Sequence, residues 1–196
     1  RQPRGKNFRA DPNLVLILKH SMNELSAEAI VLDCRESGEF DKIIFLYTQE
    51  LGKVAAKAVS ARKITSKLAG HLEPLNIVKI RLIQKNGGFK IADAIALRKI
   101  KRSFEALALA GFIKEMTFEL ASDKKLWLAI KKSFQELDKK KEAPYAPLLK
   151  ILGFDPKFAD CGICNGKHVA YFVKNETTFL CRRCAFKAPK NELILL

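Results

Sequence analysis

Residues 76–97 read NIVKIRLIQKNGGFKIADAIAL, and this stretch decides the fold of the first part of the chain. Apolar and polar residues alternate over Asn76–Lys85 and again over Phe89–Leu97, which is the period of a strand with one buried face. The tripeptide Asn86-Gly87-Gly88 between them is a strong turn signal, because Asn and Gly accept the backbone angles of tight hairpin turns. The stretch therefore predicts an antiparallel β-hairpin.

The residues before this hairpin also carry strand patterns. Alternating apolar residues, rich in β-branched and aromatic types, predict three further strands at Ala29–Arg35, Lys42–Thr48 and Lys53–Val59. A short helical or loop stretch is expected over Ser66–His71. Five strands with a helical insertion after the third match the small Greek-key barrel called an OB-fold, which we expect over residues 26–99.

After Ile100 the apolar period becomes that of a helix, and a helical region is expected over residues 100–155. Two helices should bury apolar stripes, one of Phe104, Leu107, Ala108, Gly111 and Phe112, the other of Leu126, Ile130, Phe134 and Leu137. A third, shorter helix should lie between Pro147 and Gly153. The charged run Asp138–Glu142 is expected to be a solvated connector. The fold class is thus α+β with several modules.

Two CxxC motifs form the most specific signal in the chain. Cys161 and Cys164 make the first, Cys181 and Cys184 the second, and sixteen residues separate them. This spacing predicts a four-Cys zinc site. Four thiolates leave no open coordination position, so the Zn²⁺ should be structural. Replacement of one thiolate by His168 is a minor alternative, and so is a redox pair, because neither motif lies in a βαβ pattern.

The segment around these motifs should be a zinc ribbon over residues 156–190, followed by a tail over residues 191–196. His168–Val173 and Thr177–Leu180 have the pattern of short strands. The segment has little apolar mass, so metal binding should stabilise it. Paired CxxC motifs fit a reducing compartment better than a disulfide framework. The fifth cysteine, Cys34, lies in an apolar strand pattern and is expected to be a small buried hydrophobic residue.

The chain carries a formal net charge of +15, which attracts polyanions such as nucleic acid or an anionic membrane surface. The charge is uneven: residues 28–50 hold six acidic and two basic residues, whereas residues 51–92 hold nine basic residues and only Glu73 as an acid. A basic protein without a polyanionic partner, or a plain solvated barrel surface, is the alternative.

Within Asn76–Lys85, apolar residues alternate with Lys79 and Arg81, so one face of this strand should feed the core while the other offers cations. The cations of this basic region that are predicted to contact the phosphates of a nucleic acid are Lys53, Lys57, Arg62, Lys63, Lys67, Lys79, Arg81, Lys85 and Lys90. Phe45, Tyr47 and Phe89 are candidates for stacking on single-stranded bases, although their alternation also suits the core.

Several classes of protein are disfavoured. No run of about 18 apolar residues predicts a membrane span. No acidic cluster with metal-binding spacing, phosphate-cradling Gly-rich loop or nucleophile with a base points to an enzyme. Leu14–Leu18 is too short for a secretory signal, so a cytoplasmic location is expected. Residues 1–25 are expected to be an extension or tag, since Met22 lies just before the first predicted strand.

Ordered segments of the chain resemble the RecO family of recombination mediators. They are residues 28–32 (EAIVL), 38–43 (GEFDKI), 47–53 (YTQELGK), 66–74 (SKLAGHLEP), 148–154 (LLKILGF) and 161–164 (CGIC). The resemblance covers about residues 27–185. It implies an OB-fold, a helical middle and a zinc-bearing segment. The family generally continues with more helix than follows Cys184 here.

The resemblance also implies a function. RecO-like proteins bind single- and double-stranded DNA, anneal complementary strands and, with RecR, help load RecA onto strands coated by single-strand-binding protein in the bacterial cytoplasm, in association with the nucleoid. Basic residues in the matched segments (Lys42, Lys53, Lys67), together with Arg62 and Lys63 between two of these segments, are the implied DNA contacts. An RNA-binding OB and ribbon protein of the translation apparatus is the alternative.

Overall fold

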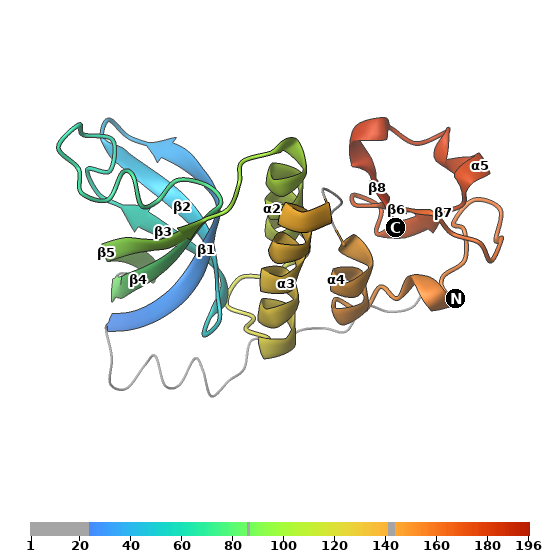
Figure 1. Ribbon diagram of the computed structural model, residues 1–196, viewed down its shortest axis with the longest axis horizontal. Coiled ribbons are helices and arrows are strands. Elements are labelled where there is room, and N and C mark those ends of the chain that lie inside the picture. The colour runs from blue at the N-terminus through green and yellow to red at the C-terminus, as the bar shows by residue number, and fades with distance from the viewer. Residues whose placement is uncertain (1–23, 86, 141–143) are drawn as a thin grey trace. The chain divides into compact units, whose positions relative to one another are not determined.

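The computed structural model describes residues 24–85, 87–140 and 144–196, and Figure 1 shows the arrangement of their helices and strands. The chain forms two compact units, one ending at Leu128 and the other beginning at Ala129. The predicted extension at residues 1–25 lies outside the described residues except for Glu24 and Leu25, which already belong to the first strand.

The first unit contains a closed five-stranded barrel. Its strands are β1 (Glu24–Ser37), β2 (Asp41–Thr48), β3 (Gly52–Ala58), β4 (Asn76–Lys85) and β5 (Gly88–Lys99). The strand order is β1-β2-β3-β5-β4, and β4 pairs back onto β1. Only β3 and β5 pair in parallel; the other four ladders are antiparallel. This connectivity is that of an OB-fold, as the strand patterns predicted.

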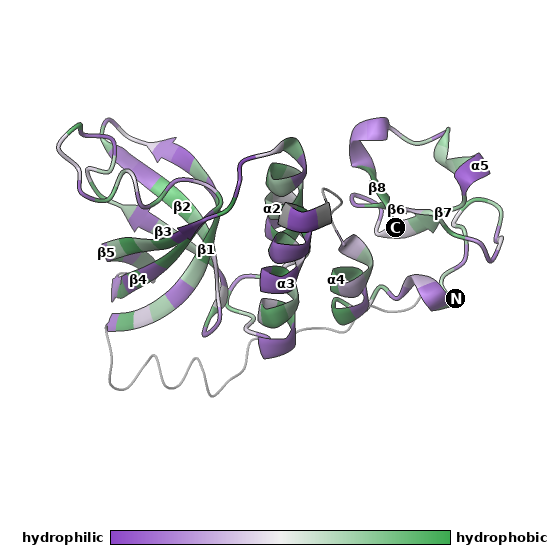
Figure 2. Ribbon diagram, in the orientation of Figure 1, coloured by the Kyte–Doolittle hydropathy of each residue, from purple (hydrophilic) through white to green (hydrophobic). Residues whose placement is uncertain are grey.

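Alternation along the strands builds the barrel core. In β4 the residues Val78, Ile80 and Leu82 are buried, whereas Lys79 and Arg81 between them are exposed. Figure 2 shows the same alternation of hydrophobic and hydrophilic residues along the strands. Inward-facing residues of all five strands form one apolar cluster, so the barrel has a core of its own.

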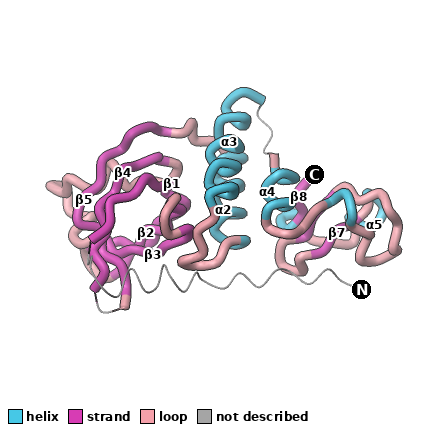
Figure 3. Tube along the Cα trace, turned by 90° about the horizontal axis from the view of Figure 1, so that it is seen from below, coloured by secondary structure: helices cyan, strands magenta, loops and turns pink. Residues whose placement is uncertain are grey.

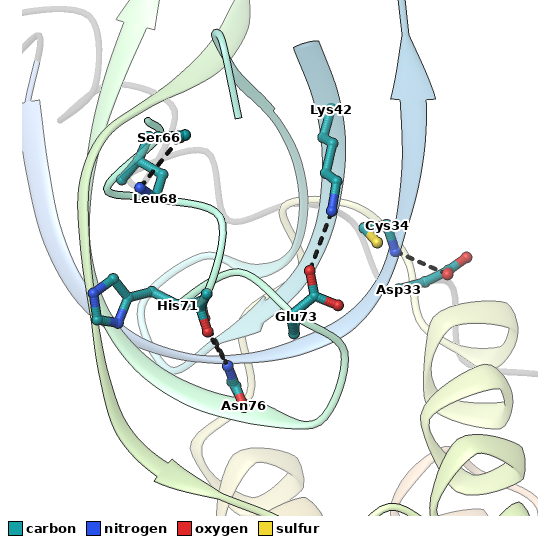
Figure 4. Close-up of polar contacts among 9 residues, drawn as sticks. Asp33, Cys34, Lys42, Ser66, Leu68, His71, Glu73 and Asn76 are labelled. Atoms are coloured by element: carbon teal, nitrogen blue, oxygen red, sulfur yellow. Dashed lines mark hydrogen bonds and ion pairs between the residues drawn. The ribbon is translucent and has the colours of Figure 1, made fainter. Parts of the chain in front are cut away.

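The connection between β3 and β4 is a series of turns (Figure 3), so of the two alternatives predicted for Ser66–His71 the loop is confirmed and the helix is wrong. Ala61 and Leu72 from this connection are buried in the barrel core. The side-chain amide of Asn76 donates to the carbonyl oxygens of Gly70 and His71, at 3.1 and 3.0 Å. These anchors fix the segment as turns that close one end of the barrel (Figure 4).

Helix α2 (Phe104–Met116) follows the barrel and packs against β1. Its N-cap is Ser103, whose hydroxyl oxygen accepts a hydrogen bond from the backbone N–H of Ala106. The predicted core face of α2 is wrong except for Phe112, because Phe104, Leu107 and Ala108 are exposed and Gly111 is half-buried. The face that is buried consists of Ala106, Leu109, Ala110, Phe112 and Ile113.

Helix α3 (Lys124–Lys140) runs across the boundary between the two units. Its predicted stripe is confirmed, since Leu126, Ile130, Phe134 and Leu137 are all buried. Residues 138–140 are the last helical residues rather than the start of the predicted connector, and residues 141–142 lie outside the described part of the chain. In α4 (Tyr145–Ile151) Pro147 lies in the first turn, and Gly153 follows the helix with φ +92°, as predicted.

The second unit ends in a small three-stranded sheet. After the 3₁₀ turn η1 (Pro156–Phe158) come β6 (Tyr171–Val173), β7 (Thr178–Leu180), helix α5 (Arg182–Ala185), the turn η2 (Lys190–Glu192) and β8 (Leu193–Leu195). The order is β7-β6-β8. The two short strands predicted at His168–Val173 and Thr177–Leu180 are present as β6 and β7, which pair antiparallel, although residues 168–170 precede the strand. The tail predicted at residues 191–196 instead supplies β8, which pairs antiparallel with β6.

Among the described residues, no helix has both the length and the apolar composition that crossing a membrane requires.

Candidate metal centre and nucleic-acid interface

The four predicted cysteine ligands lie together in the second unit. The sulfur atoms of Cys161, Cys164, Cys181 and Cys184 are all within 4.8 Å of one another, and those of Cys164 and Cys181 are 3.8 Å apart. None of the cysteines forms a disulfide. A tetrahedral zinc ion with Zn–S bonds of about 2.3 Å places its sulfurs roughly 3.8 Å apart. The four thiols therefore have the spacing of a tetrahedral tetrathiolate site.

Backbone hydrogen bonds shape the first CxxC turn. The N–H of Cys161 donates to the carbonyl of Gly166 at 2.9 Å, and the N–H of Asn165 donates back to the carbonyl of Cys161 at 2.8 Å. The turn approaches β7 closely at Gly162, where a Cβ would lie 2.4 Å from the hydroxyl oxygen of Thr178 and would displace that side chain. Close packing between this turn and β7 therefore orients the first pair of sulfurs.

The second CxxC spans the start of α5. Cys181 is the residue before the helix, and the N–H of Ala185 donates to its carbonyl at 3.0 Å. This single helical turn brings the sulfur of Cys184, three residues on, to the same point as that of Cys181. His168 is exposed and is not among the residues that gather, so four thiols make up the site.

The surroundings of the thiols favour ionisation of part of the cluster. Burial opposes ionisation of Cys161, but backbone hydrogen bonds from Cys181, Cys164 and Ile163 outweigh it and hold its pKa at about 6. A backbone hydrogen bond from Cys184 lowers the pKa of Cys181. Burial, followed by the neighbouring thiols, raises the pKa of Cys184 to about 12. A cation that binds all four sulfurs would relieve this mutual repulsion.

On the barrel, three of the predicted DNA contacts form a continuous row across neighbouring strands. Lys57 on β3 pairs with Lys90 on β5, and Lys85 on β4 lies one diagonal step from Lys90 on the same outer face. All three are exposed. Like charges at paired positions repel one another. We call Lys57, Lys85 and Lys90 the basic row.

One acidic side chain, Asp41, reduces the positive charge of the basic row. The carboxylate of Asp41 lies 2.9 Å from the ammonium of Lys57 and accepts a hydrogen bond from the backbone N–H of Ser60. The hydrogen bond from Lys57, then that from Ser60, lowers the pKa of Asp41, and the charge of Lys90 adds to the effect. Three lysines against one carboxylate still leave a net positive surface.

Arg62 and Lys63 lie at the same end of the barrel, against the turn between β1 and β2. The Arg62 guanidinium donates to the carbonyl oxygens of Gly38 and Glu39 and pairs with Glu36 at 3.2 Å. The Lys63 ammonium lies 5.1 Å from the ring centre of Phe40. The backbone N–H of Ser60 donates a hydrogen bond to the carboxylate of Asp41, which also pairs with Lys57 of the basic row. Lys63 therefore extends the positive surface beyond the strands, whereas Glu36 offsets the charge of Arg62.

Lys42 and Lys53 are engaged within the fold. The Lys42 ammonium pairs with Glu73 at 3.2 Å at the closed end of the barrel (Figure 4). The Lys53 ammonium donates to the carbonyl of Lys114, near the end of α2, at 2.9 Å, and burial lowers its pKa. The structure thus gives both lysines a clear structural role, and their contact with DNA stays a prediction.

Lys79 and Arg81 face outward on β4 but have acidic neighbours. Glu28 of β1 lies opposite Lys79, and the guanidinium of Arg81 pairs with Glu24 of β1 at 2.7 Å. Lys67 is exposed in the connection between β3 and β4 and makes no ion pair with any described residue. Lys79 and Arg81 share the outer face of β4, but each has an acidic neighbour on β1, so they add less net positive charge than the basic row.

The three stacking candidates are unavailable on the barrel surface. Tyr47 is fully buried and stacks on Trp127, with ring centres 6.4 Å apart. Phe45 lies beneath the cations of Arg35 and Lys114. Phe89 packs against the barrel core. The sequence prediction missed Phe40, a half-exposed ring beside Lys63, because it lies in a turn rather than in a strand pattern.

Two further features differ from prediction. Cys34 is half-buried rather than fully buried, and desolvation raises the pKa of its thiol. The end of β5 and the start of α2 carry four cations that the charge count stopped short of, namely Arg98, Lys99, Lys101 and Arg102. All four are exposed. Counting the charge as far as residue 102 would have found them.

The fold and the sites define a class: an OB-fold protein with a basic barrel end, joined through helices to a four-cysteine ribbon. Residues 22–113 match the family model described as Recombination protein O N terminal, and residues 97–195 match Recombination protein O C terminal. The chain belongs to the RecO family, as its resemblance indicated.

Curated relatives agree with this assignment. The chain is 29% identical over 177 residues to a protein of Bacillus velezensis, 30% over 178 residues to one of Bacillus mycoides and 30% over 187 residues to one of Bacillus cereus. These matches cover 83%, 83% and 85% of this chain, and 69%, 71% and 75% of the respective relatives. All three relatives carry the name DNA repair protein RecO.

Proposed function

We propose that this chain acts in bacterial DNA repair and recombination as a mediator that binds single- and double-stranded DNA and anneals complementary strands. The basic row is the observation that carries the proposal, because two paired lysines and a third at the diagonal position, with Asp41 as their acidic neighbour, suit binding of phosphates. The names of the relatives support the process, DNA repair. The OB-fold is a frequent scaffold for binding nucleic-acid strands.

The mechanism follows from charge. Two complementary strands repel each other through their phosphates, and a surface that binds the phosphates of both releases counterions and lowers this repulsion. The bases stay free to pair because a row of lysines contacts only the backbone. No covalent step is required, so we propose a non-enzymatic mediator.

We further propose a structural Zn²⁺ at the four thiols. The sulfur spacing and the lowered pKa of Cys161 support it, since a thiolate is the form that binds zinc. When bound, the ion would hold the two CxxC turns together. We also propose RecR, RecA and single-strand-binding protein as partners, and a place beside the nucleoid in the cytoplasm, from membership of the family alone.

Annealing of complementary oligonucleotides at increasing salt tests the proposal. Reversal of the basic row to Glu (Lys57→Glu, Lys85→Glu, Lys90→Glu) should slow annealing at least tenfold and flatten its salt dependence. A matched control reverses the exposed lysines Lys124, Lys125 and Lys132 of α3, which changes the net charge equally. Equal effects of the two triple variants would overturn the role of the row. A preference for structured RNA over DNA would overturn the function.

A further inference from the structure

A second basic surface lies on the ribbon and shares no residue with the barrel surface considered above. Residues 182–186 have helical backbone, so residues three and four positions apart lie side by side on this turn. Cys184 and Ala185 point inward and are buried, whereas Arg182, Arg183, Phe186 and Lys187 are exposed. The outward side of this turn therefore places an aromatic ring next to three cations. We call these four residues the basic–aromatic face.

Phe186 is the most exposed aromatic side chain among the described residues. Its side chain is 91% exposed, although the rings of Phe154, Phe172 and Phe179 in the same unit pack on one another with centres 5.1 to 5.4 Å apart. The ribbon thus has an aromatic core, and Phe186 is not part of it. A nearly fully exposed phenyl ring beside charged residues is a candidate contact for a ligand with an accessible π-face.

The charges around Phe186 are available to a ligand. Residues 156–190 hold seven basic residues against two acidic ones, and one of these acids, Asp160, pairs with Lys167 at 2.9 Å. Within the described part of the chain, Arg182, Arg183 and Lys187 make no ion pair. A zinc tetrathiolate with a net charge of −2 would leave the segment positive. Figure 2 shows α5 as strongly hydrophilic beside the hydrophobic strands of the ribbon.

From this combination we infer that the basic–aromatic face is a second binding site, specific for single-stranded nucleic acid. Arg182, Arg183 and Lys187 would contact phosphates, and the ring of Phe186 would stack on one unpaired base. Sequence-tolerant binding of single strands combines cations along the backbone with exposed aromatic platforms, because every base has a π-face. A duplex keeps its bases stacked on each other, so it gains only the phosphate contacts.

The inference rests on the proposed function only in taking DNA as the polymer to test. The basic row consists of lysines alone, whereas the basic–aromatic face combines cations with a ring that is 91% exposed. The basic row would therefore accept phosphates of either form of DNA, whereas the basic–aromatic face would discriminate in favour of single strands. A chain with both sites can hold two strands at once, which annealing requires.

Fluorescence of a Phe186→Trp variant tests stacking directly. Trp127 is buried and gives a constant background. Titration with an oligothymidylate should quench the emission of the indole introduced at position 186, since a stacked base quenches indole fluorescence. The matched control is Phe158→Trp, because Phe158 is 80% exposed in the same unit and also has a neighbouring cation, Lys157. Quenching at position 158 equal to that at 186, or at neither position, would overturn the inference.

Affinity gives a second readout. Phe186→Leu keeps an apolar side chain but removes the ring, and it should weaken oligothymidylate binding about tenfold with little change in duplex binding. Metal content and circular dichroism of this variant should match those of the original chain, since Phe186 packs in no core. An unchanged single-strand affinity, or an equal loss for duplex, would contradict the stacking role.

The basic-row triple variant separates this inference from the proposed function. If both are right, the triple variant combined with Phe186→Trp loses most duplex binding and annealing, but the oligothymidylate still quenches the introduced indole. If the triple variant loses annealing but the indole is quenched neither in it nor in the Phe186→Trp single variant, the second site is wrong and the basic row stands. If the indole is still quenched but the triple variant anneals at the original rate, the role of the basic row is wrong and the second site stands.

Discussion

At the scale of single residues, Glu50 shows how the barrel constrains an ionisable side chain. It follows β2, and its Oε2 atom is buried with no hydrogen-bond partner in the described part of the chain. Desolvation raises the pKa of Glu50, the charge of Glu28 adds to this, and a backbone hydrogen bond at Glu50 itself opposes it. The folded state therefore holds the proton more tightly than the unfolded chain.

Replacing Glu50 by Gln should stabilise the protein at neutral pH by no more than about 1 kcal/mol, because the side chain is still partly exposed. The sign follows from linkage: a carboxyl with a raised folded pKa costs stability as pH rises from its ordinary value through the raised one. The advantage of Glu50→Gln should vanish below that window. Urea denaturation at pH 4 and pH 7 measures both; a larger gain at pH 4 would contradict the assignment.

Gly52 is a residue whose identity the backbone dictates. Its φ is +71°, and a Cβ there would lie 2.2 Å from the carbonyl oxygen of Ala121. Gly52→Ala should destabilise the first unit by about 3 kcal/mol or more, combining left-handed strain with a backbone clash. Gly38→Ala is the matched control, because Gly38 has φ +64° with nothing near its Cβ position, and it should cost about 1 kcal/mol. If Gly52→Ala and Gly38→Ala lost equal stability in thermal or urea unfolding, the clash at position 52 would be refuted.

Residue types at fixed spacing were predictable, but their partners were not. The CxxC spacing alone placed Cys161, Cys164, Cys181 and Cys184 together, because two residues between thiols leave little choice of geometry. By contrast, the count of cations could not distinguish an exposed lysine of the basic row, Lys90, from Lys53, whose ammonium donates a hydrogen bond to the carbonyl oxygen of Lys114. That difference depends on strand register and on packing of α2, and both are tertiary properties.

At the scale of elements, the β4–β5 hairpin and α2 mark the two extremes of predictability. The hairpin has strict alternation and an Asn-Gly-Gly turn, so only one register buries its apolar side. Helix α2 is apolar on nearly every side, so periodicity offers several faces of similar quality. Packing on β1, with the Lys114 ammonium 2.6 Å from the carboxylate of Asp33, selects the face that is buried.

The orientation of α2 makes a prediction within one helix. Leu109 is fully buried, whereas Leu107, which the periodicity had placed in the core, is 36% exposed. Leu109→Ala should lower the free energy of unfolding by about 2 to 4 kcal/mol, and Leu107→Ala by less than about 1 kcal/mol. Both variants remove the same atoms from the same helix, so helix propensity cancels. If urea unfolding showed a larger loss of stability for Leu107→Ala than for Leu109→Ala, the buried face predicted from periodicity would be correct.

At the scale of the whole molecule, the sequence predicted the modules but not all of their edges. Charge, periodicity and cysteine spacing each change along the chain, so these patterns predicted the barrel, the helices and the ribbon in their correct order. Strand β8 was missed, because three residues are too few to show a period. Its pairing with β6 is a contact between segments about 20 residues apart in the chain, which no local pattern records.

The two units should respond differently to loss of metal. The barrel core consists of barrel residues and needs no ion, whereas the ribbon has a small apolar cluster that includes Cys161 and Cys184. Chelation of Zn²⁺ should therefore raise amide hydrogen exchange in β6, β7 and β8 by several orders of magnitude and leave β1–β5 protected. Trp127 stacks on Tyr47 in the first unit, so its emission should not change. A red shift of Trp127 on chelation would show instead that the ion stabilises the barrel as well. Cys161→Ser with Cys164→Ser should reproduce the effect of the chelator.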